Sequence, residues 1–109
     1  MSGVVKHILL LKFKDSISPD EQTALIQKYA ALPNSISAMK GFEWGTDISV
    51  ENMHQGFTHA FISTFDSPQG RDEYLVHPVH DSFAKELLGA VDNALVFDFN
   101  PTVALKANS

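Results

Sequence analysis

The densest group of side chains that could do chemistry is a tyrosine and two histidines around one proline. Tyr74 precedes His77 and His80, and Pro78 lies between the two histidines. A residue that precedes proline is disfavoured in a helix, so we expect one helix to end near His77 and a second to begin at Pro78. His77 would then cap the second helix, and His80 would lie in its first turn.

The charge state of His80 decides what this group could do. The positive end of a helix dipole favours a neutral imidazole, which can act as a base, whereas the adjacent Asp81 favours the imidazolium. The sequence leaves the net pKa shift open. As a base, His80, paired with the phenol of Tyr74, would remove a proton from a ligand. The alternative is a hydrogen-bonded histidine with no chemical role.

Two further histidines, His7 and His59, share one face of two predicted strands by parity. Together with His77 and His80 they could line one pocket, although each could equally be a core histidine bonded to the backbone. The spacing of His77 and His80 does not match a zinc-binding His-Glu-x-x-His helix, so no metal is expected. Tyr29 lies on the apolar stripe of a predicted helix, where packing is favoured over a hydroxyl at a pocket edge.

The elements that must position these residues form a short series. We expect a strand over 4–13, and a helix that starts at the capping box Ser18-Pro19-Asp20-Glu21 and ends or kinks near Pro33. Strands over 39–47 and 57–65, separated by a polar loop over 48–56, precede a helix that starts at Pro68 and breaks before Pro78. Its second part should turn residues including Phe83 and Val91 inward, and a last strand covers 94–99. The order β-α-β-β-α-β predicts a ferredoxin-like α+β fold.

The predicted sheet has helices on one side only, so its other face needs a cover. The face with His7 and His59 carries large apolar residues, and we assign it to the open side: Leu9, Leu11, Phe57, Phe61 and Phe65. A second copy of the chain is the simplest cover. We therefore expect a homodimer, or a larger oligomer, in which two sheets form an α/β barrel with a lined interior and in which Phe61→Asp abolishes dimerisation.

Composition narrows the class of protein. The chain has 109 residues with 44% hydrophobic and 19% charged, which predicts one domain, assigned to 4–101 with a tail over 102–109. The net charge of −5 gives no basis for binding nucleic acid. The longest apolar run, 8–11, is far shorter than the roughly 20 residues of a membrane span. With no cysteine and no signal peptide, we expect a cytoplasmic protein.

Several short motifs, in this order and spacing, resemble the stress-responsive dimeric α/β barrel family over 5–101. They include Val5-Lys6-His7, Trp44-Gly45-Thr46-Asp47, Gly56-Phe57-Thr58-His59, His77-Pro78-Val79-His80 and Phe97-Asp98-Phe99. The resemblance implies a homodimer of ferredoxin-like subunits. The family includes heat-stable stress proteins of plants and polyketide cyclases.

Similarity to the cyclases implies that His80 is the catalytic base and Tyr74 its hydrogen-bond donor. It also implies a set of ligand-binding residues: His7, Leu9, Ile26, Tyr29, Phe42, His59 and His77. Ile26 and Val91 stand where the cyclases carry a phenylalanine and a tryptophan.

Two functions remain open. One is a stress-response dimer that binds a small organic molecule in an apolar, histidine-lined pocket. The alternative is a cyclase-like lyase without a cofactor, which closes a polyketide-like substrate by intramolecular aldol condensation. An open pocket that reaches His80 and Tyr74 would favour a ligand site, and an interior filled by Phe57, Phe61 and Leu9 would argue against one.

Overall fold

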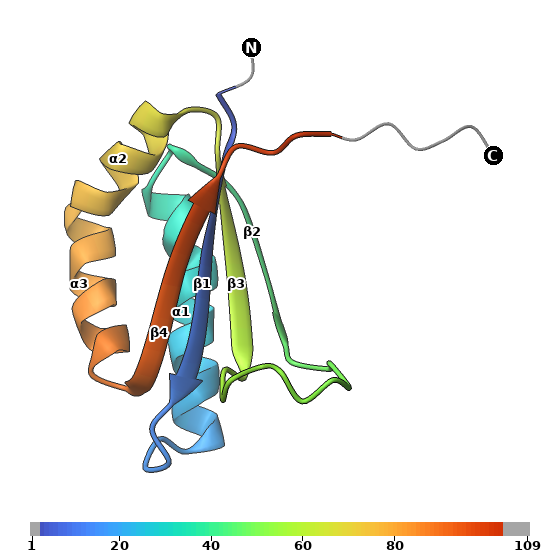
Figure 1. Cartoon of the computed structure of the whole chain (residues 1–109). Coiled ribbons are helices and arrows are strands. Elements are labelled where there is room, and N and C mark those ends of the chain that lie inside the picture. Colours follow the sequence, from blue (N-terminus) through green and yellow to red (C-terminus); the bar gives the residue numbers. More distant parts are fainter. Residues whose placement is uncertain (1–2, 104–109) are drawn as a thin grey trace.

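Four antiparallel strands form one sheet, and the helices lie on one of its faces (Figure 1). The computed structural model describes residues 3–103. The elements are β1 (Val5–Phe13), α1 (Pro19–Ser35), β2 (Met39–Thr46), β3 (His59–Phe65), α2 (Pro68–Val76), α3 (Pro78–Leu88) and β4 (Val91–Phe99). The strand order is β2-β3-β1-β4, with β1 and β3 in the centre. This is the ferredoxin-like α+β fold, as predicted, with its second helix split into α2 and α3.

Helix α1 begins as the sequence predicts but ends later. The Ser18 hydroxyl accepts from the Glu21 N–H at 3.1 Å, and the Glu21 carboxylate accepts from the Ser18 N–H at 2.9 Å. Of the two outcomes predicted at Pro33, an end or a kink, the end is wrong, because the helix continues to Ser35. Pro33 removes only its own N–H, and the Ile36 N–H still donates to the Leu32 carbonyl at 2.9 Å.

The break between α2 and α3 is where the prolines predict it. His77 has an extended backbone, with φ −66° and ψ 134°, and it separates the two helices. Its Nδ1 accepts from the Val79 N–H at 3.1 Å, so that the side chain caps α3. Three strand starts differ from the prediction: β1 begins at Val5, β3 at His59 and β4 at Val91. Val91 therefore belongs to the sheet and not to the inner side of a helix.

The predicted assignment of the two sheet faces is wrong. The side chains of β1 that face the helices are Val5, His7, Leu9, Leu11 and Phe13, all buried. On β3, Phe61 and Phe65 are 0% exposed on the same side. These residues form the core beneath the helices, so they are not free to contact a second copy. The error arises because β1 is apolar on both faces in its middle, and parity alone cannot identify the covered one.

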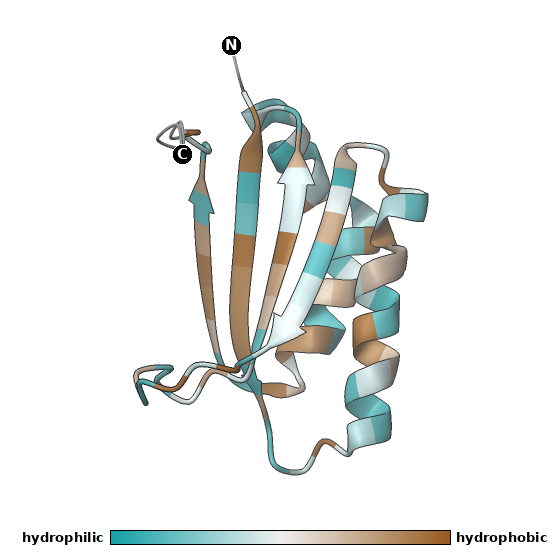
Figure 2. Ribbon diagram, turned by 90° about the vertical axis from the view of Figure 1, so that its right-hand side faces the viewer, coloured by the Kyte–Doolittle hydropathy of each residue, from teal (hydrophilic) through white to brown (hydrophobic). Residues whose placement is uncertain are grey.

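The open face of the sheet is the opposite one, and it is also apolar. Residues paired directly across strands lie on the same face, and Leu95, Phe97 and Phe99 of β4 pair with Leu10, Ile8 and Lys6 of β1. The three β4 residues are 42%, 59% and 41% exposed. Hydrophobic segments run along β1 and β4 (brown in Figure 2).

Two other predictions bear on the rest of the chain. Within residues 3–103, no helix is long and apolar enough to cross a lipid bilayer. The predicted tail over 102–109 has no regular secondary structure at 102 and 103, and its remaining residues lie outside the described part of the chain.

Candidate functional site

A cavity of about 270 Å³ lies between the helix-facing side of the sheet and the helices. All three helices and both β1 and β4 contribute to its lining, which is mostly apolar: His7, Leu9, Tyr29, Tyr74, Leu75, His80, Phe83, Ala84, Leu87, Leu88, Val96 and Asp98. Val96 is 60% exposed although it points to the helix side, because the edge strand β4 is not fully covered. The cavity is therefore accessible at this edge. We call it the helix-side pocket.

His80 and Tyr74 lie against each other in this pocket, with ring centroids 4.2 Å apart. The His80 Nδ1 lies 3.2 Å from the Leu75 carbonyl oxygen. Because a carbonyl oxygen only accepts, Nδ1 carries the proton, and in the neutral ring the lone pair lies on Nε2. Burial lowers the pKa of His80, and the bond to the Leu75 carbonyl opposes this in part. His80 is therefore suited to accept a proton at Nε2.

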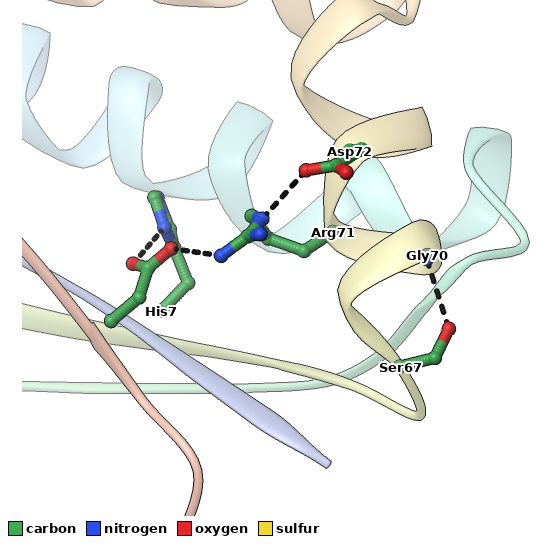
Figure 3. A network of polar contacts seen from close by, with 6 residues as sticks. His7, Ser67, Gly70, Arg71 and Asp72 are labelled. Atoms are coloured by element: carbon green, nitrogen blue, oxygen red, sulfur yellow. Dashed lines mark hydrogen bonds and ion pairs between the residues drawn. The ribbon is translucent and has the colours of Figure 1, made fainter. Parts of the chain in front are cut away.

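A chain of polar contacts supports the second histidine of the pocket (Figure 3). His7 Nδ1 lies 2.7 Å from Asp98 Oδ1, and Asp98 Oδ2 lies 2.9 Å from Arg71 Nη1. Arg71 Nε donates in turn to Asp72 at 2.9 Å. A carboxylate accepts, so His7 Nδ1 donates and the ring orientation is held. The same figure shows the Ser67 hydroxyl accepting from the Gly70 N–H at 3.0 Å, which caps α2 and positions Arg71.

The two tyrosines of the pocket are buried and protonated. Burial raises the pKa of both Tyr29 and Tyr74, so each hydroxyl is available as a hydrogen-bond donor near neutral pH. The ring of Tyr29 packs on Phe61 at 4.9 Å and on Phe83 at 5.1 Å between centroids. Tyr29 therefore combines both expected roles, since its ring belongs to the core and the residue also lines the pocket.

The structure brings only part of the predicted site together. His7, Leu9, Tyr29, Tyr74 and His80 line the helix-side pocket. Its location differs from the predicted one, since it lies beneath the helices and not on the open face of the sheet. This pocket reaches His80 and Tyr74, the feature expected of a ligand site, whereas Phe61 and Leu9 are buried in the core.

Four predicted site residues lie elsewhere. Ile26 and Phe42 pack against the core, and His77 caps α3. His59 lies at the far end of β3, with its ring 5.1 Å from Phe13, and lines a separate cavity of about 430 Å³ beneath the loop over 47–58. Partial burial lowers the pKa of His59. The helix-side pocket thus contains two histidines, not four.

Asp98 and Arg71 are the polar residues that sequence reasoning missed. Asp98 is an acidic residue between Phe97 and Phe99 in an apolar strand, and this pattern is the signal that could have identified it. Its partner is found only from the pairing of β1 with β4, which places Asp98 directly opposite His7. Among the residues that the structure describes, no group of three or more histidines and carboxylates could hold a metal ion.

The fold and the pocket together define a class: a ferredoxin-like α+β protein with a cavity of small-molecule size between its two layers. The model of the family described as the stress responsive A/B barrel domain matches residues 5–101. The chain belongs to this family.

Two relatives of the chain are a stress-response protein and an enzyme. The chain is 52% identical over 100 residues to the stress-response A/B barrel domain-containing protein HS1 of Arabidopsis thaliana, covering 92% of each. It is 36% identical over 97 residues to olivetolic acid cyclase of Cannabis sativa, covering 89% of this chain and 96% of the cyclase.

Solved structures have the same fold. Hydroxynitrile lyase from Passiflora edulis matches with a TM-score of 0.89 and 32% identity, covering 95% of this chain and 100% of the lyase. A dimeric ferredoxin-like protein from Jannaschia sp. CCS1 matches with a TM-score of 0.80 and 21% identity, and the match covers 91% of this chain and 100% of that protein.

Proposed function

We propose that this member of the stress-responsive family binds a small, mostly apolar organic molecule in the helix-side pocket. The observation that carries the proposal is the convergence of His7, Tyr74 and His80 on a cavity whose other walls are apolar. Ligand sites generally combine an apolar lining with a few positioned polar groups. A cytoplasmic location is part of the same proposal.

The binding protein is proposed to be a homodimer. Its solved neighbours include a protein described as dimeric, and the open sheet face of this chain carries Leu95, Phe97 and Phe99 in exposed positions. Burial of each such side chain contributes about 1.5–3 kcal/mol. A second copy on this face would leave the helix-side pocket accessible, because the pocket lies on the other side of the sheet.

A pocket-filling variant tests the binding proposal. Ala84 lines the pocket, so Ala84→Phe should occupy part of its volume. Ala30→Phe, on the exposed side of α1, is the matched control. Thermal unfolding should be followed with a panel of linear β-keto acids and small ketones. At ten times its Kd, a ligand should raise Tm by about 5 °C in the wild type and in Ala30→Phe. Ala84→Phe should show no such shift; an equal shift in both variants would contradict the proposal.

A second candidate function is catalysis, and the specific observation in its favour is the contact between His80 and Tyr74. His80 Nε2 would take a proton from a carbon between two carbonyl groups. The electron pair of the C–H bond would move to a carbonyl oxygen, to which Tyr74 donates a hydrogen bond. The resulting enolate carbon would bond to a second carbonyl carbon of the same molecule, whose oxygen takes up a proton. The names of two relatives, a cyclase and a lyase, support an enzyme.

A product screen separates the two candidates. Linear β-keto acids should be incubated with the wild type, His80→Ala and His54→Ala, and the products analysed by mass spectrometry. His54 lies in the exposed loop over 47–58 and is the matched control. Catalysis predicts a cyclised product that His54→Ala also forms and His80→Ala does not. If the wild type binds a keto acid but forms no product, the binding function is retained and catalysis is rejected.

A further inference from the structure

Ser63 occupies a position where packing alone would favour an apolar residue. It lies on the helix-facing side of β3 between Phe61 and Phe65, and all three residues are 0% exposed. Among the described residues, its hydroxyl oxygen makes no hydrogen bond of standard geometry. A buried hydroxyl without a partner costs free energy, and an alanine would avoid that cost. The serine therefore requires an explanation other than packing.

Tyr29 closes over Ser63 from one side. Its ring centroid lies 4.9 Å from that of Phe61, two residues before Ser63, and 4.7 Å from that of Phe42. Phe42 is the residue of β2 that pairs with Ser63. The Tyr29 ring thus spans the two neighbours that flank the serine.

Tyr74 closes over Ser63 from the other side. Its ring centroid lies 4.9 Å from that of Phe65, two residues after Ser63, and 5.9 Å from that of His7. His7 is the residue of β1 that pairs with Ser63. The serine hydroxyl is therefore enclosed between two tyrosines, and both of these tyrosines line the helix-side pocket.

Proximity of the three hydroxyls has a consequence for their protons. Contact with the Ser63 hydroxyl lowers the pKa of each tyrosine against the larger effect of burial, which raises it. Each hydroxyl has one proton to donate. The side chains of Tyr29 and Tyr74 also contact each other, so the three hydroxyls form one cluster. When two of the three protons form bonds within the cluster, the third is left for an acceptor outside it. Ser63 has no surface in the pocket, so the free proton belongs to a tyrosine.

We propose that Ser63 is a positioning residue that orders the hydroxyls of Tyr29 and Tyr74 so that one tyrosine O–H is directed at a carbonyl oxygen of the ligand. The pocket would then select small apolar molecules that carry a carbonyl group. This inference rests on the proposed function, since it needs a ligand in the helix-side pocket.

A matched pair of probes tests it: acetophenone, and ethylbenzene, which has the same carbon skeleton without the oxygen. Kd values for both should be measured by NMR titration of the full chain. In Ser63→Ala the ratio of the ethylbenzene Kd to the acetophenone Kd should fall about 3- to 10-fold, the value of one hydrogen bond. Thr64→Ala removes a hydroxyl from the adjacent residue on the open face, which bonds Lys6 at 2.9 Å, and should leave the ratio unchanged.

A second variant keeps the test possible if Ser63→Ala does not fold. Tyr29→Phe keeps the ring and removes another of the three clustered hydroxyls, so the ratio of the ethylbenzene Kd to the acetophenone Kd should fall in the same way. A wild-type ratio in the folded variants would overturn the inference and leave the proposed function in place. Failure of both probes to bind the wild type would overturn the proposed function, and this inference with it.

Discussion

His7 and Asp98 lie 91 residues apart in the chain and face each other across β1 and β4, with imidazole Nδ1 2.7 Å from carboxylate Oδ1. The second carboxylate oxygen binds Arg71 of α2 at 2.9 Å. One carboxylate thus connects the central strand, the edge strand and a helix beside the helix-side pocket. It also holds a buried histidine in one orientation.

Loss of this carboxylate should destabilise the fold. Asp98→Asn removes the negative charge and one of the two acceptor oxygens, so the side chain cannot accept from both His7 and Arg71, and the free energy of unfolding should fall by about 1–2 kcal/mol. Asp72→Asn removes the exposed end of the same chain of contacts and should change it by less than about 0.5 kcal/mol. Urea unfolding measures both. Equal losses in the two variants would show that the contacts of Asp98 with His7 and Arg71 stabilise the fold no more than the exposed Arg71–Asp72 pair does.

His77 and His80 should respond differently to substitution. His77→Ala removes the side-chain cap of α3 and should lower the free energy of unfolding by about 0.5–1 kcal/mol, whereas His77→Asn should keep most of it. His80→Ala should have a smaller effect on stability. If the protein acts on a β-keto acid, His80→Ala should reduce turnover by about 10²- to 10⁴-fold. An active His80→Ala variant would reject the assignment of the base.

Stability should fall as the pH drops through the titration of His59 and His80, which are partly buried. Burial holds the pKa of His80 and His59 below the ordinary 6.5. Between the folded pKa and 6.5, the unfolded chain binds more protons, so the folded state loses stability with falling pH and levels off below the folded pKa.

Urea unfolding from about pH 7.5 to about pH 5.5 measures this loss. It should be smaller in His80→Gln and smallest when His59→Gln is added. His54→Gln, in the exposed loop over 47–58, should keep the wild-type loss. A double variant that loses as much stability as the wild type would contradict the burial of these two rings.

The open sheet face should control the oligomeric state. Phe97→Asp places a charge on this face and should produce a monomer, whereas Val76→Asp, on an exposed position of α2, should leave the dimer intact. Multi-angle light scattering at micromolar concentration distinguishes the two. Phe61→Asp, expected from sequence to abolish dimerisation, should instead prevent folding, because Phe61 is in the core. A wild-type monomer would contradict the homodimer.

Local signals predicted the order of the elements well. The capping box at Ser18, the break at Pro78 and the cap at His77 each depend on a few adjacent residues, and the structure contains all three. Pro33 misled because it removes one hydrogen bond, from its own position to the Tyr29 carbonyl, without ending the helix, which continues to Ser35.

Contacts between residues far apart in the chain could not be predicted from the sequence. The middle of β1 is apolar on both faces, so only the packing of the helices decides which side is the core. The contact of His7 with Asp98 depends on strand register, and the burial of Ser63 depends on two tyrosines from different helices. For the same reason His59, which shares parity with His7, lies at the far end of β3 and outside the helix-side pocket.

The location of a bound ligand tests the central claim most directly. Backbone amide NMR signals should be followed while acetophenone is added to the wild-type protein. The account predicts saturable shifts that cluster on Leu9, Tyr74, His80 and Phe83, which line the helix-side pocket. Shifts confined to the loop over 47–58 or to the open sheet face, with none at these four residues, would contradict it.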